Sequence, residues 1–476
     1  MSITIQVQGL RSLFTSCADV QLQTHEYGAE PHVEKVVFVF CTGLADPVQI
    51  NQVVLPQLEQ NKSLPLLPVS LGGSRNAVEQ EIVTKVFSGE LILLFEGTGE
   101  LFSLNVSKLP QRQTEESTYE VSLKGPRDSF TESVEINVAL LRKRVRSTTL
   151  CHESFVVGKR SQTKVSLMYL SDVLNEDVLK EARMRLNSIE VDIVNGVSPL
   201  EDLLADSPYS LLPLISYNTR PDYVVESLQR GRFCILIDGA PAALIAPINF
   251  QYLVKSAEDM YMPYFFVTFE RLMRYLAYFI AVMLPGFALS LVSFHTEHLP
   301  FPLLATISLN SYGVPTSPSV ELFAMLFLFD LFREAGVRLP KPVGSTVTCI
   351  GGLIVGDAVI RAGLTSPNII VIVAVTFMGQ FVLINQSYAS AVIFMRTYVL
   401  LLSTVLGLFG FLIANFSILL YMSTLKSFGM PYLSEIIDPL DVDSIKSVIQ
   451  FPKPFQRTPP KFLRTKKTHR QGDDSE

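Results

Sequence analysis

"GRFCILIDGAPAALIAPINF", residues 231–250, reads as a strand, a tight turn and a second strand. Between its two apolar runs, "IDGAPA" supplies the Asp, Gly and Pro residues that favour turns. A similar stretch, "GELILLFEGTGELFSLNV" at 89–106, has "FEGTGE" at its turn. Residues 231–250 come just before the chain becomes strongly hydrophobic. We therefore expect this hairpin to form the closing edge of a sheet in a second soluble unit, at its junction with a membrane half.

The composition indicates that part of the chain lies in lipid. Of its 476 residues, 48% are hydrophobic, and the mean hydropathy of +0.32 is high for a soluble protein. The start, "MSITIQVQGLRSLFTSCADV", mixes polar and apolar residues and does not resemble a signal peptide. We therefore expect a cytosolic N-terminus.

The cysteines predict neither a disulfide framework nor a zinc site. They are odd in number, scattered and free of C-x-x-C spacing. They are Cys17, Cys41, Cys151, Cys234 and Cys349. Reduced, buried thiols are the simpler interpretation.

The end of the chain is basic, although the formal net charge of the whole is −6. Its cationic residues are Lys453, Arg457, Lys461, Arg464, Lys466, Lys467 and Arg470. Such a tail suits an anionic lipid surface. A solvated, disordered end is the alternative.

Two segments of the N-terminal half repeat one order of elements. Residues 35–60, "KVVFVFCTGLADPVQINQVVLPQLEQ", and residues 164–189, "KVSLMYLSDVLNEDVLKEARMRLNSI", each predict an apolar strand, an acidic turn and an amphipathic helix. After a gap, each is followed by one of the two Gly-led hairpins. The apolar run from Val36 to Phe40 is typical of a strand buried on both faces. We predict two similar α/β subdomains, with chance likeness between two apolar strands as the alternative.

Residues 125–145, "GPRDSFTESVEINVALLRKRV", place acids before bases. The acids are Asp128, Glu132 and Glu135, and the bases that follow are Arg142, Lys143, Arg144 and Arg146. Acids at the start of a helix and bases at its end complement the helix dipole, which explains the charges without a ligand. Contact of the basic cluster with lipid headgroups or an acidic partner is the alternative.

The first membrane span is predicted in "LMRYLAYFIAVMLPGFALSLVSF", residues 272–294, with Arg271 and Arg274 at its start. The stretch is long enough to cross a hydrocarbon core of about 30 Å. Its Pro285-Gly286 pair predicts a kink. No Lys or Arg occurs from residue 295 to residue 320, which places that loop on the far side of the membrane.

Further apolar stretches follow at 319–335, 343–361, 367–386 and 397–422. The first of them carries Glu321, Asp330, Arg333 and Glu334. Because charge within a bilayer is costly, these groups are expected to face protein, water or the interface, and we interpret this helix as interfacial or re-entrant. Four spans then return the basic tail to the cytosol. Five crossings, with the tail outside, are the alternative.

Residues 345–363, "STVTCIGGLIVGDAVIRAG", place small residues at helical spacing. Thr348, Gly352 and Gly356 recur every four residues, and Gly351 lies beside them, so helix backbones can approach closely. This predicts either an oligomer or packing against a neighbouring span. Asp357 precedes Arg361 by one turn, and the two charges could neutralise each other. Alternatively, a ring of Asp357 side chains from several copies would attract cations in a water-filled pore.

The phosphate-binding and nucleophile motifs of common enzymes are missing: the sequence has no G-x-x-x-x-G-K-[ST], G-x-G-x-x-G or G-x-S-x-G. Catalysis is therefore not expected. "HTEH" at 295–298 brings two imidazoles near an acid, but without a further ligand nearby it is interpreted as an interfacial loop rather than a metal site. Basic residues do not alternate with aromatic ones, so nucleic-acid binding is not predicted either.

From about residue 12 to residue 433, these motifs resemble those of the A subunits of GerA-type spore germinant receptors. The resemblance is carried by "GPRDSFTESVEINVALLRKR", "SPYSLLPLISYNTRPDYVVESLQRGRFCILIDGAPAALIAPINF", "REAGVRLPKPVGSTVTCIGGLIVGDAVIRAGLTSP" and "SFGMPYL". It implies a protein of the inner membrane of the bacterial spore, working with a transporter-like, germinant-binding B subunit and a lipoprotein C subunit. The A subunit is implied to oligomerise and to open an ion path.

Mapped onto this chain, the resemblance implies that the small-residue helix forms a pore wall. Val355 and Val359, one turn apart, are then candidate constriction residues, with Asp357 and Thr348 beside them, because a dry apolar ring can gate by dewetting. Arg333, Glu334 and Gly336 match the family's R-E-A-G signature, with a structural role. Relatives commonly carry Gln where Asp357 stands, which leaves the ion preference open.

The expected fold class is an α/β cytosolic N-terminal region of two similar subdomains, followed by an all-α transmembrane bundle. The expected division is a lead-in (1–33), subdomain 1 (34–145), subdomain 2 (146–255), a transmembrane domain (256–430) and a basic, disordered cytosolic tail (431–476). The expected function is that of a non-enzymatic, germinant-gated cation channel subunit without cofactor, metal or nucleic acid. A transporter subunit for a small solute and a non-conducting scaffold are the alternatives.

Overall fold

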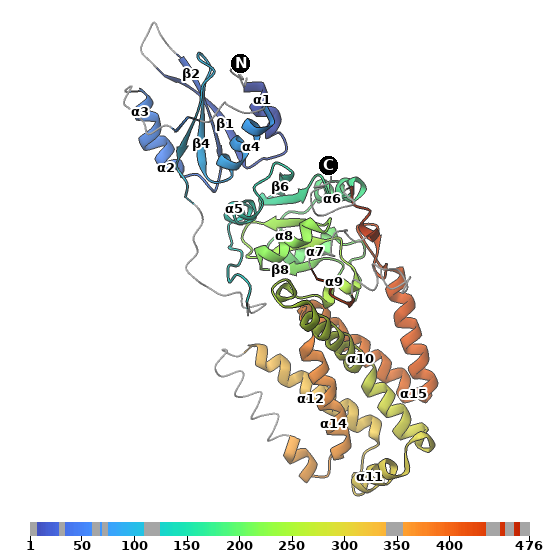
Figure 1. Ribbon diagram of the computed structural model, residues 1–476. Coiled ribbons are helices and arrows are strands. Elements are labelled where there is room, and N and C mark those ends of the chain that lie inside the picture. Colours follow the sequence, from blue (N-terminus) through green and yellow to red (C-terminus); the bar gives the residue numbers. More distant parts are fainter. Residues whose placement is uncertain are drawn as a thin grey trace.

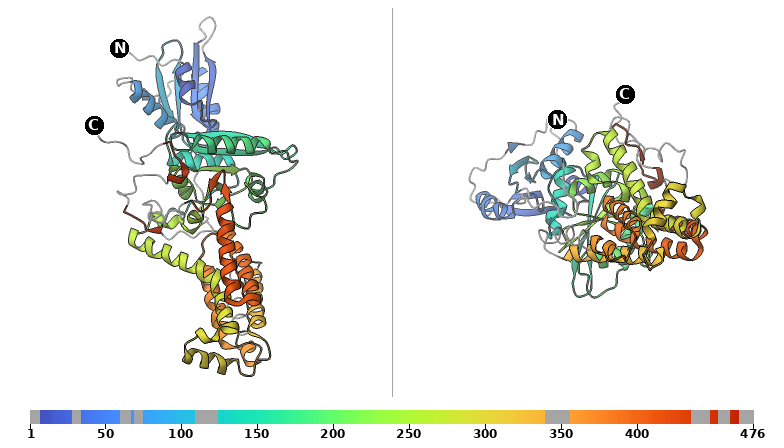
Figure 2. Two further views of the ribbon diagram at one scale, coloured as in Figure 1. Left: turned by 90° about the vertical axis from the view of Figure 1, so that its right-hand side faces the viewer. Right: turned by 90° about the horizontal axis from the view of Figure 1, so that it is seen from below.

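The computed structural model places an α/β region at one end of the molecule and a helical region at the other (Figure 1). It describes residues 7–27, 34–59, 67–68, 75–108, 124–338, 356–434, 448–452 and 461–466. The described α/β region contains two five-stranded sheets. Figure 2 shows the first sheet, the second sheet and the helices following one another along an elongated molecule.

The first sheet is antiparallel throughout, in the order β1-β2-β4-β5-β3. Its strand β2 is buried on both faces: Val37 and Val39 pack with α1 and α4, while Val36 and Phe38 pack with the short helices that follow β2. The prediction for this apolar run is confirmed. The elements are α1 (Val7–Leu13), β1 (Val20–Tyr27), β2 (Glu34–Cys41), α2 (Pro47–Gln49), η1 (Ile50–Val54), α3 (Leu55–Glu59), β3 (Leu67–Pro68), α4 (Arg75–Val86), β4 (Glu90–Phe95) and β5 (Leu101–Asn105).

The second sheet repeats this topology as β6-β7-β9-β10-β8. Helix α5 precedes β6 as α1 precedes β1, and α8 precedes β9 as α4 precedes β4. The predicted duplication is therefore confirmed by strand order as well as by element order. The elements are α5 (Val134–Arg144), β6 (Leu150–Val157), β7 (Thr163–Leu170), α6 (Glu176–Ser188), α7 (Val197–Leu204), β8 (Ser216–Asn218), α8 (Pro221–Gln229), β9 (Phe233–Ile237) and β10 (Ala243–Ala246).

The hairpin of residues 231–250 forms as predicted, but it is not at the edge of its sheet. Strands β9 and β10 pair antiparallel, with Leu236 opposite Ala243. The short strand β8 then pairs with the outer side of β10, with Tyr217 opposite Leu244. The expectation of a closing edge is corrected, because three residues of a loop-like segment cover the free backbone groups of β10.

Two elements lie outside the segments expected for them. Strand β1 belongs to residues 1–33, the expected lead-in, yet it pairs along its whole length with β2. Helix α5 belongs to the segment expected for the first subdomain, yet Val138 and Leu141 join the core of the second sheet. We therefore propose that subdomain 1 begins at α1 and that subdomain 2 begins at α5.

Among the described residues of the helical region, two helices are long and apolar enough to cross a membrane, Tyr264–Phe294 and Ser387–Thr424. A third, Pro367–Val382, is apolar but shorter. The first continues as one helix through Pro285. The elements are α9 (Phe250–Val254), η2 (Ala257–Met260), α10 (Tyr264–Phe294), η3 (Thr296–His298), α11 (Phe301–Ser311), α12 (Pro318–Arg338), α14 (Pro367–Val382) and α15 (Gln386–Thr424).

Helix α15 reverses direction at Gly407, whose φ of 61° and ψ of −139° are not helical. The hydroxyls of Tyr398 and Ser417 lie 2.9 Å apart, although a straight helix would separate residues this far apart in sequence by about 28 Å. The two arms are therefore antiparallel, and each has roughly 20 residues, the length of one membrane crossing.

After α15 the chain returns to the second sheet. The hairpin β11 (Lys426–Ser427) and β12 (Met430–Pro431) packs there: Ser427 Oγ donates to the Leu214 carbonyl at 2.6 Å, and the Ile248 N–H donates to Ser427 Oγ at 3.0 Å. Both ends of the helical region thus lie at the second subdomain. We call this end of the bundle proximal and the opposite end, at α11, distal (Figure 1).

Part of the basic tail is bound rather than disordered. The Lys466 N–H donates to the Val173 carbonyl at 3.0 Å, Lys466 Nζ lies 3.0 Å from Glu176, and Leu463 is only 1% exposed. This segment contains the short helix η5 (Lys461–Leu463). The expectation of a disordered tail is corrected for residues 461–466, because a buried leucine and an ion pair to Glu176 of α6 hold them on the second subdomain.

Candidate functional site

The glycine-rich stretch singled out by the sequence lies only partly within the described residues. Thr348, Gly351, Gly352 and Val355 fall outside them. Gly356 starts a helical segment that runs to residue 361 and includes Asp357 and Val359. Only this last part of the stretch can be placed in the bundle.

Asp357 and Arg361 form an ion pair one helical turn apart. Arg361 Nε donates to Asp357 Oδ2 at 2.7 Å, so the pairing that the sequence allowed as one of two possibilities forms within a single chain. The side chain of Asp357 is 57% exposed, and that of Arg361 is 79% exposed. A Cβ atom placed on the neighbouring Gly356 would meet nothing within 4 Å. Within the part of the chain that the structure describes, this side of the segment is therefore open at Gly356.

Val359 faces the other way. It is partly buried and packs against an apolar cluster that includes Leu289 of α10, Leu322 of α12 and Val373 of α14. Within one chain, therefore, Val359 contributes to helix packing, while Asp357 points away from the bundle.

Arg333, Glu334 and Gly336 lie in the last turns of α12, near a charged cluster inside the bundle. Asp330 Oδ2 accepts a hydrogen bond from Arg396 Nη2 at 2.6 Å, and Arg333 Nη2 lies 4.0 Å from Asp330 Oδ1. The sequence reasoning missed Arg396, which is 1% exposed. Its signal was available, because Arg396 is the only basic residue in α15 and a lone charge in an apolar helix needs a partner.

Glu321 is held by the start of α14. It is 3% exposed, and its Oε2 accepts from the Ser366 N–H at 2.8 Å and from Thr365 Oγ1 at 3.2 Å. Of the three surroundings expected for the charges of this apolar helix, namely protein, water or the interface, Glu321 and Asp330 face protein. Glu321 connects α12 to the start of α14, and Asp330 connects α12 to α15.

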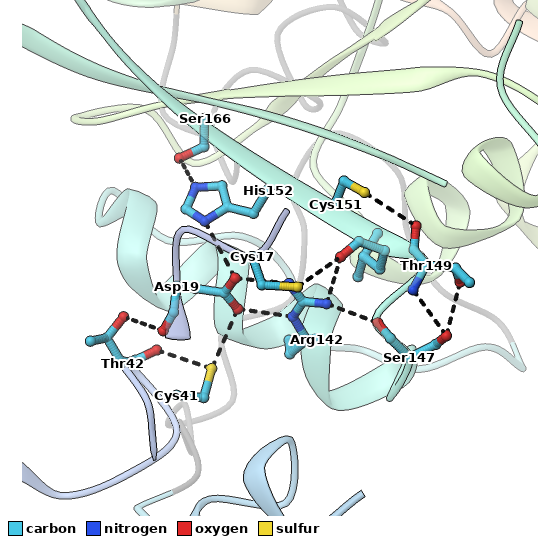
Figure 3. A network of polar contacts seen from close by, with 11 residues as sticks. Cys17, Asp19, Cys41, Thr42, Arg142, Ser147, Thr149, Cys151, His152 and Ser166 are labelled. Atoms are coloured by element: carbon cyan, nitrogen blue, oxygen red, sulfur yellow. Dashed lines mark hydrogen bonds and ion pairs between the residues drawn. The ribbon is translucent and has the colours of Figure 1, made fainter. Parts of the chain in front are cut away.

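A buried ion pair joins the two subdomains (Figure 3). Asp19 lies just before β1. Its carboxylate accepts hydrogen bonds from Arg142 Nε at 2.9 Å and from Arg142 Nη2 at 2.8 Å. His152 Nδ1 of β6 lies 3.5 Å from Asp19 Oδ1, and its Nε2 is 2.9 Å from Ser166 Oγ. Arg142 is 0% exposed and Asp19 3%, so this contact is a fixed part of the interior. The predicted helix-dipole role of Arg142 is therefore only part of its role.

Two thiols adjoin this pair. Cys41 Sγ donates to Asp19 Oδ2 at 3.4 Å, and Cys17 Sγ approaches the Leu150 carbonyl at 3.9 Å. Burial raises the pKa of Cys17 to about 11 and raises that of Cys41 further. Both therefore stay protonated near neutral pH, which agrees with the prediction of reduced, buried thiols.

A second charged junction joins the second subdomain to α10. Asp259, in η2, accepts from Arg271 Nε and from Arg274 Nη1, each at 2.9 Å. The three residues are between 2% and 7% exposed. The sequence placed both arginines at the start of a span, but it could not show that one carboxylate holds them together.

The same short helix is also tied back to the second sheet. Arg220, which precedes α8, donates from Nη1 to Glu258 Oε1 at 2.5 Å and from Nη2 to Asp222 Oδ2 at 2.7 Å. Glu258 and Asp259 are neighbours, so η2 is bound on one side by the subdomain and on the other by α10. Buried charge contacts on both sides of η2 therefore connect the second sheet to α10.

Comparisons with known proteins agree on one family. Residues 8–462 match the model of the family described as "Bacillus/Clostridium GerA spore germination protein". The chain is 33% identical to spore germination protein XA of Bacillus anthracis, over 99% of this chain and 98% of that protein. It is also 33% identical to spore germination protein B1 of Bacillus subtilis (strain 168), over 93% of each.

A solved structure is also similar: the N-terminal domain of the A subunit of the Bacillus megaterium spore germinant receptor GerK3. It is 25% identical to this chain, with a TM-score of 0.37, over 52% of this chain and 96% of that one. The assignment rests on the near full-length sequence matches. This chain therefore belongs to the GerA family of spore germination proteins, as a non-enzymatic, A-subunit-like member.

Proposed function

We propose that this chain forms, with further copies of itself, a germinant-gated cation channel in the inner membrane of the spore. A transporter-like B subunit binds the germinant, and a lipoprotein C subunit completes the receptor. Binding on the partner shifts the channel from closed to open, which requires that the germinant-bound partner favour the open state.

Membrane insertion is supported by the outer surface of the bundle. Large apolar side chains of α15 are strongly exposed, with Val405 at 72%, Phe409 at 66% and Phe416 at 65%. Helix α10, with 31 residues, is about 46 Å long, more than a hydrocarbon core requires. Such faces are stable in lipid and costly in water.

The return of the chain supports the predicted sidedness. Helix α10 leaves the second subdomain at Asp259, and the segment after α15 rejoins it at Ser427. Both ends of the bundle then lie on one side of the membrane, with an even number of crossings. This favours the predicted return of the basic tail to the cytosol over the alternative of five crossings.

The observation that carries the channel proposal is the open side of residues 356–361. Exposed charges at Asp357 and Arg361 are unfavourable against lipid. A water-filled path between copies would hydrate them, and small residues there let helices approach. Of the four pore-lining candidates, Asp357 has the best support. Val359 packs within its own chain, and Thr348 and Val355 rest on the sequence alone.

Measuring ion flux would test the proposal. The complex would be reconstituted in liposomes, and potassium efflux would be measured for wild type, Val355→Ala and Asp357→Asn. A channel passes many ions per opening, Val355→Ala raises the resting leak, and Asp357→Asn lowers the preference for cations over anions. If neither substitution changes the flux, the pore assignment is wrong. Slow flux limited by a transport cycle would indicate a transporter subunit. No flux at all would indicate a non-conducting scaffold.

The oligomer has its own test. A Cβ atom at Gly356 would meet nothing within 4 Å, so we expect Gly356→Leu to leave the monomer folded and to break the contact between copies. Gly379→Leu is the contrasting control, since its Cβ would approach the Ala277 carbonyl at 2.8 Å inside the chain. An unchanged oligomer size for Gly356→Leu, measured by light scattering in detergent, would place that face outside the interface.

A further inference from the structure

A compact group of metal-ligating side chains lies at the distal end of the bundle, in the turn η3 between α10 and α11. We propose that His295, Glu297 and His298 form a binding site for a divalent transition metal ion of the Zn²⁺ type. The sequence weighed this "HTEH" turn as an interfacial loop for want of a further ligand. The structure shows that Glu297 itself stands within reach of both imidazoles.

The distances fit three ligands of one ion. One donor atom from each residue lies within 4.8 Å of the other two. His295 Nδ1 is 3.3 Å from Glu297 Oε1, and His298 Nε2 is 4.0 Å from the same oxygen. Zinc bonds of about 2.0–2.1 Å in a tetrahedron separate neighbouring ligand atoms by roughly 3.3 Å. The first spacing meets this value, and a small side-chain rotation closes the second.

The backbone holds the turn that presents these groups. The His295 N–H donates to the Leu291 carbonyl at 3.2 Å, and the His298 N–H donates to the His295 carbonyl at 3.1 Å. The turn is thus hydrogen-bonded to the end of α10, and little backbone order has to be gained on binding. The histidine side chains are 34% and 62% exposed, which leaves the remaining coordination position to water.

The donor set also selects the class of ion. Neutral imidazole suits zinc, copper and nickel, whereas calcium and magnesium prefer oxygen ligands. Glu297 adds a carboxylate oxygen, which zinc also accepts as a ligand beside imidazole nitrogens.

A simple acid–base pair is the competing explanation. The 3.3 Å contact between His295 and Glu297 would exist without a metal. The two explanations differ for His298: a metal site needs it as a third donor, whereas the His295–Glu297 pair does not. Substitution of His298 therefore distinguishes them.

Zinc titration of the full-length protein in detergent tests the proposal. After chelator treatment, binding is measured by competition with a chromophoric zinc indicator, and Co²⁺ absorption reports the ligand geometry. We expect one Zn²⁺ more per wild-type chain than for His295→Ala/His298→Ala, and at least tenfold weaker binding for His298→Ala and Glu297→Gln. Millimolar calcium should not displace the zinc. Thr296→Ala, within the same turn, is the matched control and should bind as wild type does.

Equal zinc binding by wild type and the double variant would overturn the proposal, as would full binding by His298→Ala. Because the chain has six histidines, the difference between proteins is the readout rather than total binding. Hydrogen exchange gives an independent measure: zinc should slow exchange at the amides of residues 295–299 in wild type and leave them unchanged in the double variant. Thermal melting without metal verifies that both proteins are folded.

Discussion

Arg142 and Asp19 form a bidentate ion pair although they are 123 residues apart in sequence. Arg142 Nε and Nη2 donate to the two carboxylate oxygens of Asp19 at 2.9 and 2.8 Å. The pair is buried where the two subdomains join, and His152 of the second sheet adjoins the same carboxylate. The relative position of the subdomains therefore depends on a charge contact that neither could satisfy alone.

Removing one member of this pair should destabilise the protein strongly. Asp19→Ala leaves a buried guanidinium without its carboxylate, and we expect a loss of about 3–5 kcal/mol in the free energy of unfolding. Asp19→Leu combined with Arg142→Met should recover most of it, because no charge is then buried. Urea unfolding followed by circular dichroism measures both. Arg144→Ala, at a pair that is 25% and 36% exposed, is the control and should cost less than about 1 kcal/mol.

The free energy of unfolding should depend on pH through the carboxylate of Asp19. Burial alone would raise the pKa of Asp19, but the neighbouring His152 and the charge and hydrogen bonds of Arg142 outweigh it and hold that pKa well below the usual range. In the unfolded chain, the pKa of an Asp side chain is about 3.9. A depressed folded pKa gives stability that is present above this value and is lost as the pH falls towards the folded pKa. Between about pH 4 and pH 2, wild type should lose more stability than the Leu/Met double variant. Parallel curves for the two proteins would contradict this.

Asp259→Ala should uncouple the second subdomain from the bundle. The carboxylate holds Arg271 and Arg274 together, so its removal leaves two buried cations less well paired, at a cost of about 3–5 kcal/mol. We expect a lower melting temperature and, in reconstituted receptors, potassium efflux that no longer responds to germinant. Glu270→Ala serves as the control: among the described residues Glu270 pairs with Arg274, and it is 30% exposed, so its loss should have the smaller effect.

Gly407→Ala should disrupt the reversal of α15. A side chain at φ 61° and ψ −139° is strained by about 1–3 kcal/mol, and its Cβ would lie 2.9 Å from the Phe294 ring. We expect less folded protein in detergent by size-exclusion chromatography. Phe294→Ala in the same chain should recover part of the loss, since it relieves the contact but not the backbone strain. Leu406→Ala, at an exposed neighbouring position, should behave as wild type.

Leu463→Asp should release the C-terminal segment. Burial of a leucine contributes about 1.5–3 kcal/mol, and Leu463 is the buried anchor of residues 461–466. Without it, the amide of Lys466, which donates to the Val173 carbonyl, should exchange its hydrogen rapidly. Arg464→Ala, where the side chain is exposed, should leave that amide protected. Unchanged protection in Leu463→Asp would mean that the ion pair to Glu176 is sufficient.

Local patterns predicted much of this fold. The hairpin of β9 and β10 follows from two apolar runs around Gly239, where a positive φ of 84° requires glycine. The double burial of β2 follows from an unbroken apolar run. The pairing of Asp357 with Arg361 follows from helical spacing alone. In each case the interacting residues are near in sequence, so composition and period determine the outcome.

The contacts that join the parts could not be predicted in this way. Asp19 contacts Arg142, Asp330 contacts Arg396, and Leu463 becomes buried against the second subdomain only after distant segments have packed together. The position of β8 beyond β10 and the reversal at Gly407 are of the same kind. The sequence by itself determined the two halves and the duplicated order of the first, because hydrophobic period is a local property. Only the tertiary structure decided which buried charges are partners, because desolvated charges are satisfied by whichever groups the packing brings within reach.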